Sequence, residues 1–243
     1  MRKILIWFVC LLAAGRIQAQ HTASLQKAVA ILEEAGHHFT SGSQSLNMHY
    51  TIADADQPDV LLDSMKCSMQ TLGNNFRMET GNMLTIKNDR YTIVVFHEDK
   101  LIYLTGASPR DSSAPNPAGM LIQALQSAGM AQSDIREEGD TVTLHFRFGE
   151  NSAYRDMLIK LNKDHSRLYS SQYLIDGEQL PFEFKDLTKG TYALLQVIFS
   201  YRPAVGLTAA DFDERQFFTR KDNVLVPTGA YKNYEVITGT PSN

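Results

Sequence analysis

Residues 141–148 read TVTLHFRF, and this stretch decides the fold class of the 243-residue chain. Val142, Leu144, Phe146 and Phe148 alternate with polar side chains at every other position. Successive side chains of a strand point to opposite faces of a sheet, so a period of two predicts a strand with one buried and one solvated face. Strands of this kind are typical of antiparallel sheets, and a mainly β fold is therefore predicted.

The same period of two recurs on both sides of this stretch. It predicts further strands at residues 46–52, 65–70, 76–79, 84–86, 92–96, 101–104, 157–161, 169–175, 182–184, 195–201, 224–226 and 234–237. Polar turn residues separate most of these segments, and Asp176-Gly177 is a strong signal for a two-residue hairpin. Nothing repeats at a fixed period, and the strands are expected to form one meander.

Two segments show the helical period instead. Apolar residues recur at helical spacing over residues 25–39, with Gly36 as a candidate stop. A second helix is expected to start at Pro117, because proline is favoured at the first helical position, and to present Leu121 and Leu125 on one face. We predict a mainly β fold with a single curved antiparallel sheet and two to three helices packed on its concave side.

The chain starts with the layout of a secretory signal peptide. A positive start over residues 1–3 precedes an apolar run over residues 4–14, and small residues end the stretch at Ala19. The run is too short to span a bilayer, and a buried N-terminal helix is the alternative. We expect cleavage after about Ala19 and export to the periplasm. No lipid anchor is expected, because Cys10 lies inside the apolar run rather than at its end.

Composition favours a globular protein that does not bind nucleic acid. Hydrophobic residues make up 43% and charged residues 21%, so disorder is not expected. The net charge of -4 lacks the basic face that nucleic acid requires, and the expected cleavage makes the chain more acidic. Cleavage also leaves Cys67 as the single cysteine, so a buried free thiol is expected. Residues 20–243 are predicted to form one domain, with an extension over 202–243.

Motifs for catalysis or metal binding are missing. The sequence contains no phosphate-binding glycine loop, no Gly-x-Ser-x-Gly elbow and no His-Glu-x-x-His pair. Neighbouring His37 and His38 point about 100° apart on a helix and cannot easily share one ion. Asp54, Asp56 and Asp59 lack the ligand ladder and glycine of a calcium loop.

We therefore predict no catalytic residue, no metal and no cofactor. A Ser-His-Asp arrangement stays open, because any chain of this size contains its parts, and an exported hydrolase is the less favoured alternative.

Flexible apolar side chains stand out instead. Met48, Met65, Met69 and Met78 all fall on the apolar phase of the early predicted strands. Unbranched thioether side chains adapt to varied apolar partners, so they suit a cavity for an apolar ligand. Ordinary core filling is the alternative interpretation.

The order of the predicted elements adds to this pattern. An apolar leader, an amphipathic helix, a β meander, a central helix and a second meander follow one another, most clearly from Asn116 to Leu187. This order, with Ile135–Leu144 and Met157–Leu161 among the strands, resembles the LolA-type lipoprotein carriers. The family often has an arginine before an early Pro-Asn pair, whereas residues 71–74 of this chain read TLGN.

Members of that family are half-open β barrels with a helix lid over an apolar cavity, and the resemblance implies the same for this chain. It implies a periplasmic carrier or chaperone that shields the acyl chains of outer-membrane lipoproteins, or a related apolar ligand. The implied partners are those acyl chains, an inner-membrane lipoprotein-releasing ABC transporter and an outer-membrane acceptor. An RseB-like envelope sensor that binds a protein partner on the same fold is the alternative. The expected cavity residues, chosen by their apolar phase, are Met48, Tyr50, Met65, Met69, Phe76, Met78, Leu121, Leu125 and Phe146.

Overall fold

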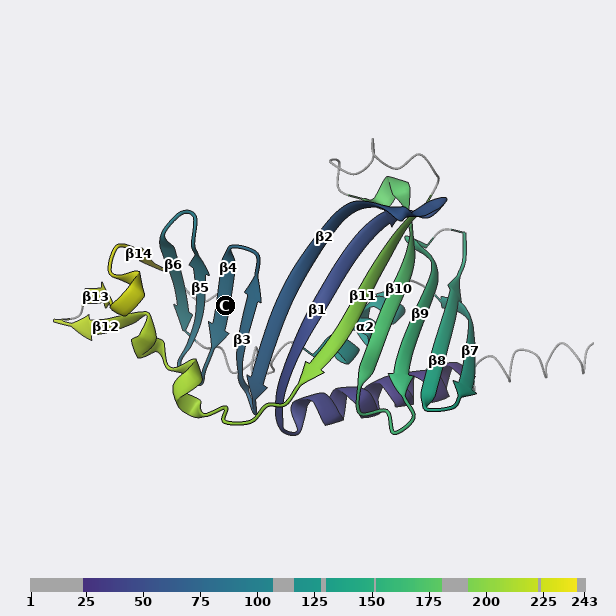
Figure 1. Cartoon of the computed structure of the whole chain (residues 1–243), viewed down its shortest axis with the longest axis horizontal. Coiled ribbons are helices and arrows are strands. Elements are labelled where there is room, and N and C mark those ends of the chain that lie inside the picture. Colours follow the sequence, from purple (N-terminus) through teal and green to yellow (C-terminus); the bar gives the residue numbers. More distant parts are fainter. Residues whose placement is uncertain are drawn as a thin grey trace, which may run out of the picture. The chain divides into compact units, whose positions relative to one another are not determined.

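The computed structural model divides into two compact units, each assembled from three segments of the chain (Figure 1). It describes residues 24–106, 116–127, 130–150, 152–180, 192–222 and 224–239. Unit 1 comprises Met1–Gly36, Ala53–Leu62 and Ala118–Leu195, and unit 2 comprises His37–Ile52, Asp63–Pro117 and Gln196–Asn243. The predicted signal peptide and the predicted strand at 182–184 lie outside the described residues.

Strands dominate both units. They are β1 (Ser43–Asp54), β2 (Gln57–Leu72), β3 (Asn75–Thr80), β4 (Met83–Lys87), β5 (Tyr91–Phe96), β6 (Leu101–Gly106), β7 (Met130–Glu138), β8 (Thr141–Phe148), β9 (Tyr154–Asn162), β10 (Leu168–Asp176), β11 (Tyr192–Arg202), β12 (Phe218–Lys221), β13 (Val224–Pro227) and β14 (Glu235–Thr238). The helices are a first helix over residues 24–40 and α2 (Pro117–Ser127). Short 3₁₀ turns are η2 (Gly177–Gln179), η3 (Ala209–Phe212), η4 (Glu214–Gln216) and η5 (Gly229–Tyr231).

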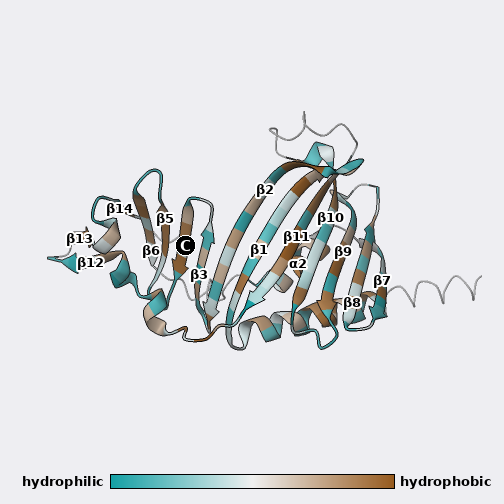
Figure 2. Ribbon diagram, viewed as in Figure 1, coloured by the Kyte–Doolittle hydropathy of each residue, from teal (hydrophilic) through white to brown (hydrophobic). Residues whose placement is uncertain are grey.

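Twelve of these strands are hydrogen-bonded in the order β14-β6-β5-β4-β3-β2-β1-β11-β10-β9-β8-β7. The pairings from β2 to β6 and from β7 to β10 are antiparallel, whereas β14 runs parallel to β6. Hydrophobic and hydrophilic residues alternate along many strands (Figure 2). The predicted mainly β fold with one large, mostly antiparallel sheet and two helices is therefore confirmed, while the curvature of the sheet stays a prediction.

The first helix runs through the glycine that was expected to end it. Ala28, Leu32, Ala35 and Phe39 are buried, as the helical spacing predicts. Gly36 is buried too, and the helix continues to residue 40. A glycine costs a helix about 1 kcal/mol, and burial of the apolar side chains on either side offsets that cost. The predicted stop at Gly36 is therefore wrong.

The expected hairpin at Asp176-Gly177 is also wrong. β10 ends at Asp176, whose Oδ1 accepts a hydrogen bond from the Glu178 backbone N–H at 2.9 Å. This contact caps the 3₁₀ turn η2 rather than closing a two-residue loop. Aspartate can serve either purpose because its short carboxylate bonds to the backbone two residues on.

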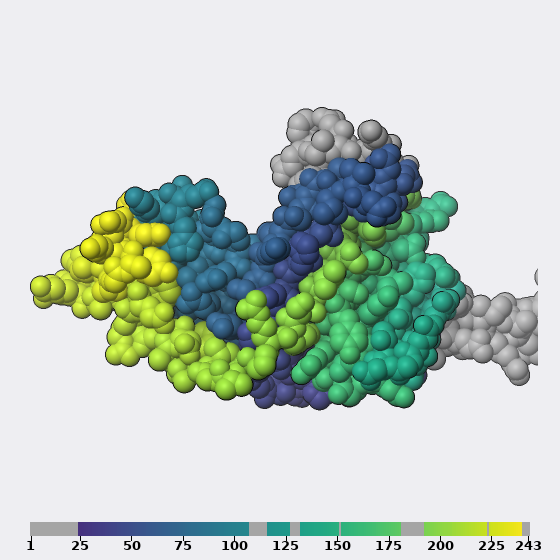
Figure 3. Space-filling model, viewed as in Figure 1, coloured from purple at the N-terminus to yellow at the C-terminus, as the bar shows by residue number. Residues whose placement is uncertain are grey.

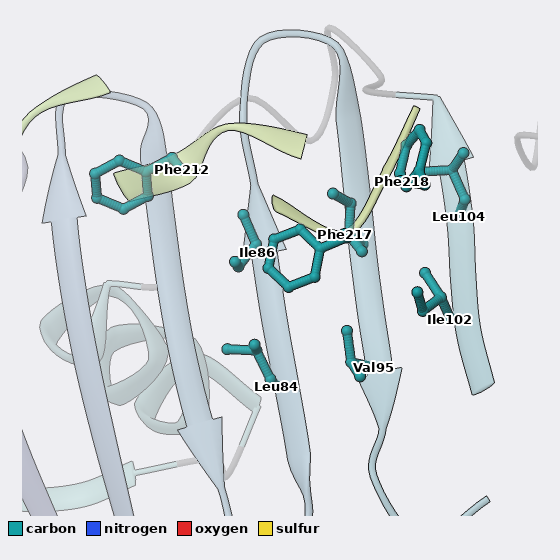
Figure 4. Close-up of a cluster of buried hydrophobic side chains, with 9 residues drawn as sticks. Leu84, Ile86, Val95, Ile102, Leu104, Phe212, Phe217 and Phe218 are labelled. Atoms are coloured by element: carbon teal, nitrogen blue, oxygen red, sulfur yellow. The ribbon is translucent and has the colours of Figure 1, made fainter. Parts of the chain in front are cut away.

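In unit 2, the C-terminal segment covers one face of the sheet. Phe212, Phe217 and Phe218 pack on the strand residues Leu84, Ile86, Ile93, Val95, Ile102 and Leu104 (Figure 4). All nine side chains are at most 4% exposed. Figure 3 shows the same segment, in yellow-green, against the blue strands β3 to β6. We call this segment, residues 203–239, the C-terminal cap.

Besides the pairing of β14 with β6, polar contacts fix the cap near the turn between β4 and β5. The Asn88 side-chain amide donates to the Phe212 carbonyl at 3.0 Å and to Glu214 Oε2 at 2.9 Å. Glu214 also forms an ion pair with Arg90, and its side chain is only 7% exposed. The short strands predicted near the C-terminus are confirmed as β13 and β14. The three buried phenylalanines, these polar contacts and the two strands make the C-terminal extension part of the core of unit 2.

Candidate apolar binding site

Two of the predicted cavity residues share one face of β1. Met48 is 4% exposed and Tyr50 is half-buried. Residues two apart on a strand point to the same side, and the Tyr50 hydroxyl donates to Met48 Sδ at 3.4 Å. The alternation seen in the sequence therefore places both side chains as expected.

The pairing of β2 with β3 assembles more of the predicted residues. Met69 lies directly opposite Met78, Cys67 opposite Thr80, and Thr71 opposite Phe76. Directly opposed residues share a face of the sheet, so these side chains form one apolar surface. We call this surface the methionine face, and it comprises Met48, Tyr50, Cys67, Met69, Phe76 and Met78.

The ionisable groups of the methionine face are held neutral. Burial raises the pKa of Tyr50, and the nearby Cys67 adds to the rise. Burial also raises the pKa of Cys67, although the Thr80 hydroxyl, which donates to its Sγ at 3.3 Å, works in the opposite direction. A protonated thiol is a weak nucleophile. The face therefore offers soft, uncharged groups that suit contact with an apolar ligand.

An apolar row extends from this face across the rest of unit 2. Cross-strand pairing places Thr85 opposite Met78, Val94 opposite Thr85, Tyr103 opposite Val94 and Ile237 opposite Tyr103. We call the series Met69, Met78, Thr85, Val94, Tyr103 and Ile237 the apolar row. Exposure rises along it from 1% at Met69 to 38% at Tyr103 and 41% at Ile237.

At the far end of the row, the backbone of Gly239 lies close to the side chain of Tyr103. Gly239 follows β14, and a Cβ atom at this position would collide with the Tyr103 hydroxyl. A second line of partly buried apolar side chains, Met83, Phe96 and Leu101, runs beside the row. The C-terminal cap packs on the alternate residues of the same strands, so the row lies on the uncapped face.

The remaining predicted cavity residues are Met65 and three residues of unit 1. Met65 shares the phase of Cys67 and Met69 but is 42% exposed near the start of the unit 2 part of β2. Leu121, Leu125 and Phe146 belong to unit 1 and are at most 4% exposed. Of the nine predicted residues, the structure therefore gathers Met48, Tyr50, Met69, Phe76 and Met78 on one face.

In unit 1, the apolar face of the sheet contains unpartnered hydroxyls. Ser133, Phe146 and Met157 are directly opposed across β7, β8 and β9, and all three are buried. Within the described residues, the hydroxyls of Ser133 and Ser171 have no hydrogen-bond partner. α2 buries Leu121 and Leu125 and leaves Met120 63% exposed. The buried residues among these belong to the core of unit 1, whereas Met120 lies on its surface.

Histidine-carboxylate pairs lie on the polar side of unit 1. His145 Nε2 lies 2.5 Å from Asp156 Oδ1, and His165 Nδ1 lies 2.7 Å from Glu34 Oε2. No serine, threonine or cysteine side chain is hydrogen-bonded to either histidine in the described part of the chain. Over the same residues, no cluster of three or more potential metal ligands occurs, and no helix has the length and apolarity to cross a bilayer.

Comparison with solved structures finds several similar proteins. An uncharacterised conserved protein from Thermus thermophilus is 13% identical, with a TM-score of 0.45 and coverage of 88% of this chain and 99% of the other. A LolA superfamily protein from Nitrosomonas europaea is 14% identical, with a TM-score of 0.33 and coverage of 77% and 98%. The Pseudomonas aeruginosa MucA/MucB complex is 12% identical, with a TM-score of 0.37 and coverage of 83% and 74%.

The LolA resemblance expected from the sequence thus recurs among the structural matches, as a divergent likeness at low identity. No family model and no curated protein matches the sequence.

Four residues of the apolar row were not predicted as cavity residues from the sequence, namely Thr85, Val94, Tyr103 and Ile237. Residues 91–96 read YTIVVF, an apolar run in which both phases are hydrophobic. The structure explains this, because Ile93 and Val95 lie under the C-terminal cap while Val94 lies on the uncapped face. A continuous apolar run is consistent with a strand buried on both sides, but it does not show which phase faces a ligand.

Proposed function

We propose that this protein binds acyl chains on the apolar row and carries them in the periplasm. The single observation that carries the proposal is the row itself. It crosses six strands of unit 2 on the face that the C-terminal cap leaves uncovered, and its outer members are more than one third exposed. The sequence resemblance to lipoprotein carriers supports the same assignment.

The chemistry of the row suits a flexible hydrocarbon. Its polar members, Thr85 and Tyr103, each carry a single hydroxyl group, and the methionines at its inner end adapt to varied shapes. Burying one methylene group contributes about 0.8 kcal/mol, so a dozen contribute about 10 kcal/mol. Such a surface supplies binding energy without any bond being made or broken.

In its fuller form, the proposal names the cargo and its route. The cargo is the acyl chains of outer-membrane lipoproteins, received from an inner-membrane ABC transporter and passed to an outer-membrane acceptor. Leu121, Leu125 and Phe146 are included as proposed cavity residues of unit 1, and Met65 as a proposed contact on β2.

Fluorescence of a dansyl fatty acid tests the core of the proposal. The wild-type protein is expected to enhance the emission saturably, and unlabelled palmitate is expected to compete. Val94→Thr places a hydroxyl in the row without changing side-chain shape and is expected to weaken binding about tenfold, because burying an unpaired hydroxyl costs about 1–3 kcal/mol. Threonine is a good strand former, so the fold is retained.

A matched substitution serves as the control. Val224 lies in β13 and is 61% exposed, so Val224→Thr should leave probe binding unchanged. Ile237→Thr, at the exposed end of the row, is a second test that does not depend on core packing. The proposal fails if the folded wild-type protein binds no probe, or if Val94→Thr, Ile237→Thr and Val224→Thr bind it equally well.

A further inference from the structure

Unit 2 also contains a depression whose lining includes several charged side chains. This depression of about 640 Å³ lies on β1, β2, β3 and β11, a volume typical of small-ligand sites. It is lined by Asn47, Met48, His49, Lys66, Cys67, Ser68, Glu79, Gly81, Ser200 and Arg202. Most of these side chains are polar or charged, which distinguishes the depression from the apolar row.

Met48 and Cys67 of the methionine face line part of this depression, while its charged residues on β2 and β3 belong to the opposite phase of these strands. Ser68 lies directly opposite Glu79, one residue out of phase with the opposed pair Met69 and Met78. Lys66 shares the phase of Ser68. The residue across from Lys66, in the turn after β3, is Gly81, and a Cβ atom there would meet nothing within 4 Å. The missing side chain therefore leaves open space in the lining that Gly81 shares with Lys66.

The depression carries uncompensated positive charge. Within the described residues, Lys66 and Arg202 have no carboxylate partner. The acidic lining residue, Glu79, is already engaged by Arg77, whose Nη2 lies 2.8 Å from Glu79 Oε1. His49 adds a further potential donor. On a chain with a net charge of -4, such a local excess of cations is a specific feature rather than a general property of the surface.

A neighbouring amide orients the arginine. With its carbonyl oxygen turned toward Arg202, the Asn47 side chain accepts hydrogen bonds from Nη2 and, at 3.0 Å, from Nε. The remaining guanidinium N–H groups stay available. A guanidinium held in this way matches the oxygens of a phosphate group, which accepts two parallel hydrogen bonds.

We propose that this depression binds a phosphate group. Arg202 and Lys66 supply the two positive charges, and the hydroxyls of Ser68 and Ser200 supply neutral donors for the remaining oxygens. The phosphate belongs either to a lipid headgroup or to a free phosphate anion. The site lies apart from the apolar row and does not depend on the proposed acyl-chain binding.

Amide chemical shifts of the labelled protein measure this binding directly. The titrants are inorganic phosphate, glycerophosphoglycerol as a headgroup without acyl chains, and acetate as a carboxylate control. Saturable shifts are expected at Lys66, Ser68 and Gly81 with phosphate compounds. Tighter binding of glycerophosphoglycerol identifies a lipid headgroup as the source, whereas equal or tighter binding of inorganic phosphate identifies the free anion.

Two double variants with the same change in charge complete the test. K66Q/R202Q is expected to weaken phosphate binding about tenfold for each cation removed, because charged hydrogen bonds are the strong ones. R220Q/K221Q removes two exposed cations from β12 and should bind as the wild type does. The dansyl fatty acid should bind K66Q/R202Q normally, which also shows that this variant is folded.

Three outcomes would overturn the proposal. They are an absence of saturable shifts with any phosphate compound, acetate binding as tight as phosphate binding, and equal losses in the two double variants. Failure of acyl-chain binding alone would leave this assignment intact, because the phosphate titration reads residues of the depression, none of which belongs to the apolar row.

Discussion

Phe217 offers the sharpest test of whether the C-terminal cap is part of the core of unit 2. Its side chain is 1% exposed, and Figure 4 shows its ring beside Ile86. The ring of Tyr231 lies against it with a centroid distance of 4.9 Å. The perturbation is Phe217→Ala, which removes the ring while leaving the backbone of the cap unchanged.

The expected loss of stability follows from this burial. Replacing a fully buried phenylalanine with alanine costs about 3–5 kcal/mol, because apolar contact is lost and a cavity remains. The contact with Tyr231 accounts for about 0.5–1.5 kcal/mol of that loss. We therefore expect Phe217→Ala to lower the free energy of unfolding by about 4 kcal/mol, a large fraction of the 5–15 kcal/mol typical of a domain.

Urea unfolding followed by circular dichroism measures this loss, and binding of a hydrophobic dye reports exposure of the strands beneath the cap. Val226→Ala is the control, because Val226 lies in the same segment but is 40% exposed and should cost less than about 1 kcal/mol. If Phe217→Ala loses no more stability than Val226→Ala and binds no extra dye, the cap is not a structural part of unit 2.

Three further substitutions test individual contacts. The buried Thr71 hydroxyl has no partner within the described residues, so Thr71→Val should raise the unfolding free energy by about 1 kcal/mol, and a loss in urea unfolding would reveal a missed partner. Glu214→Ala should cost about 2 kcal/mol in the same assay, because Asn88 and Arg90 lose their acceptor, and an unchanged midpoint would contradict this. Hydrogen bonds from Arg215 lower the pKa of Asp213 from 3.8 to about 2. This carboxylate therefore stabilises the fold above its unfolded pKa and loses that contribution as pH falls from about 4 to about 2, so the stability of Asp213→Asn should vary less with pH in that range.

The strands could be predicted from the sequence because their signal is local. The alternation at residues 141–148 became β8, and the weak pattern near the C-terminus became β13 and β14. The parallel pairing of β14 with β6 could not be predicted, since no local pattern records a partner so far away in the chain. The helix stop at Gly36 and the hairpin at Asp176-Gly177 were predicted wrongly for a related reason. Burial of the helix outweighed the turn preference of Gly36, and capping of η2 outweighed that of Asp176-Gly177.

The candidate sites differ in the same way, because local patterns predict one of them and only long-range strand pairing shows the other. Hydrophobic phase alone predicts that Met48, Met69 and Met78 lie on the buried side of their strands, and strand pairing brings Met69 and Met78 directly opposite each other. The same phase carries no sign of the polar depression, because Lys66 and Arg202 lie on strands that are distant in the sequence. Charges on the polar phase of a strand are ordinary in solution, and only strand pairing shows that two of them share a depression without a carboxylate partner among the described residues.

The C-terminal cap explains how unit 2 can leave the outer part of its apolar row, at Tyr103 and Ile237, partly exposed. An antiparallel sheet usually buries one face in the core and exposes the other face to water. Apolar side chains on the exposed face are therefore unfavourable unless the first face is already fully packed. Here Phe212, Phe217 and Phe218 bury the alternate residues of β4, β5 and β6, and the core of these strands is complete on that side. The core on the capped side therefore does not require burial of the opposite phase, which includes Val94 and Tyr103 and carries the proposed acyl-chain site.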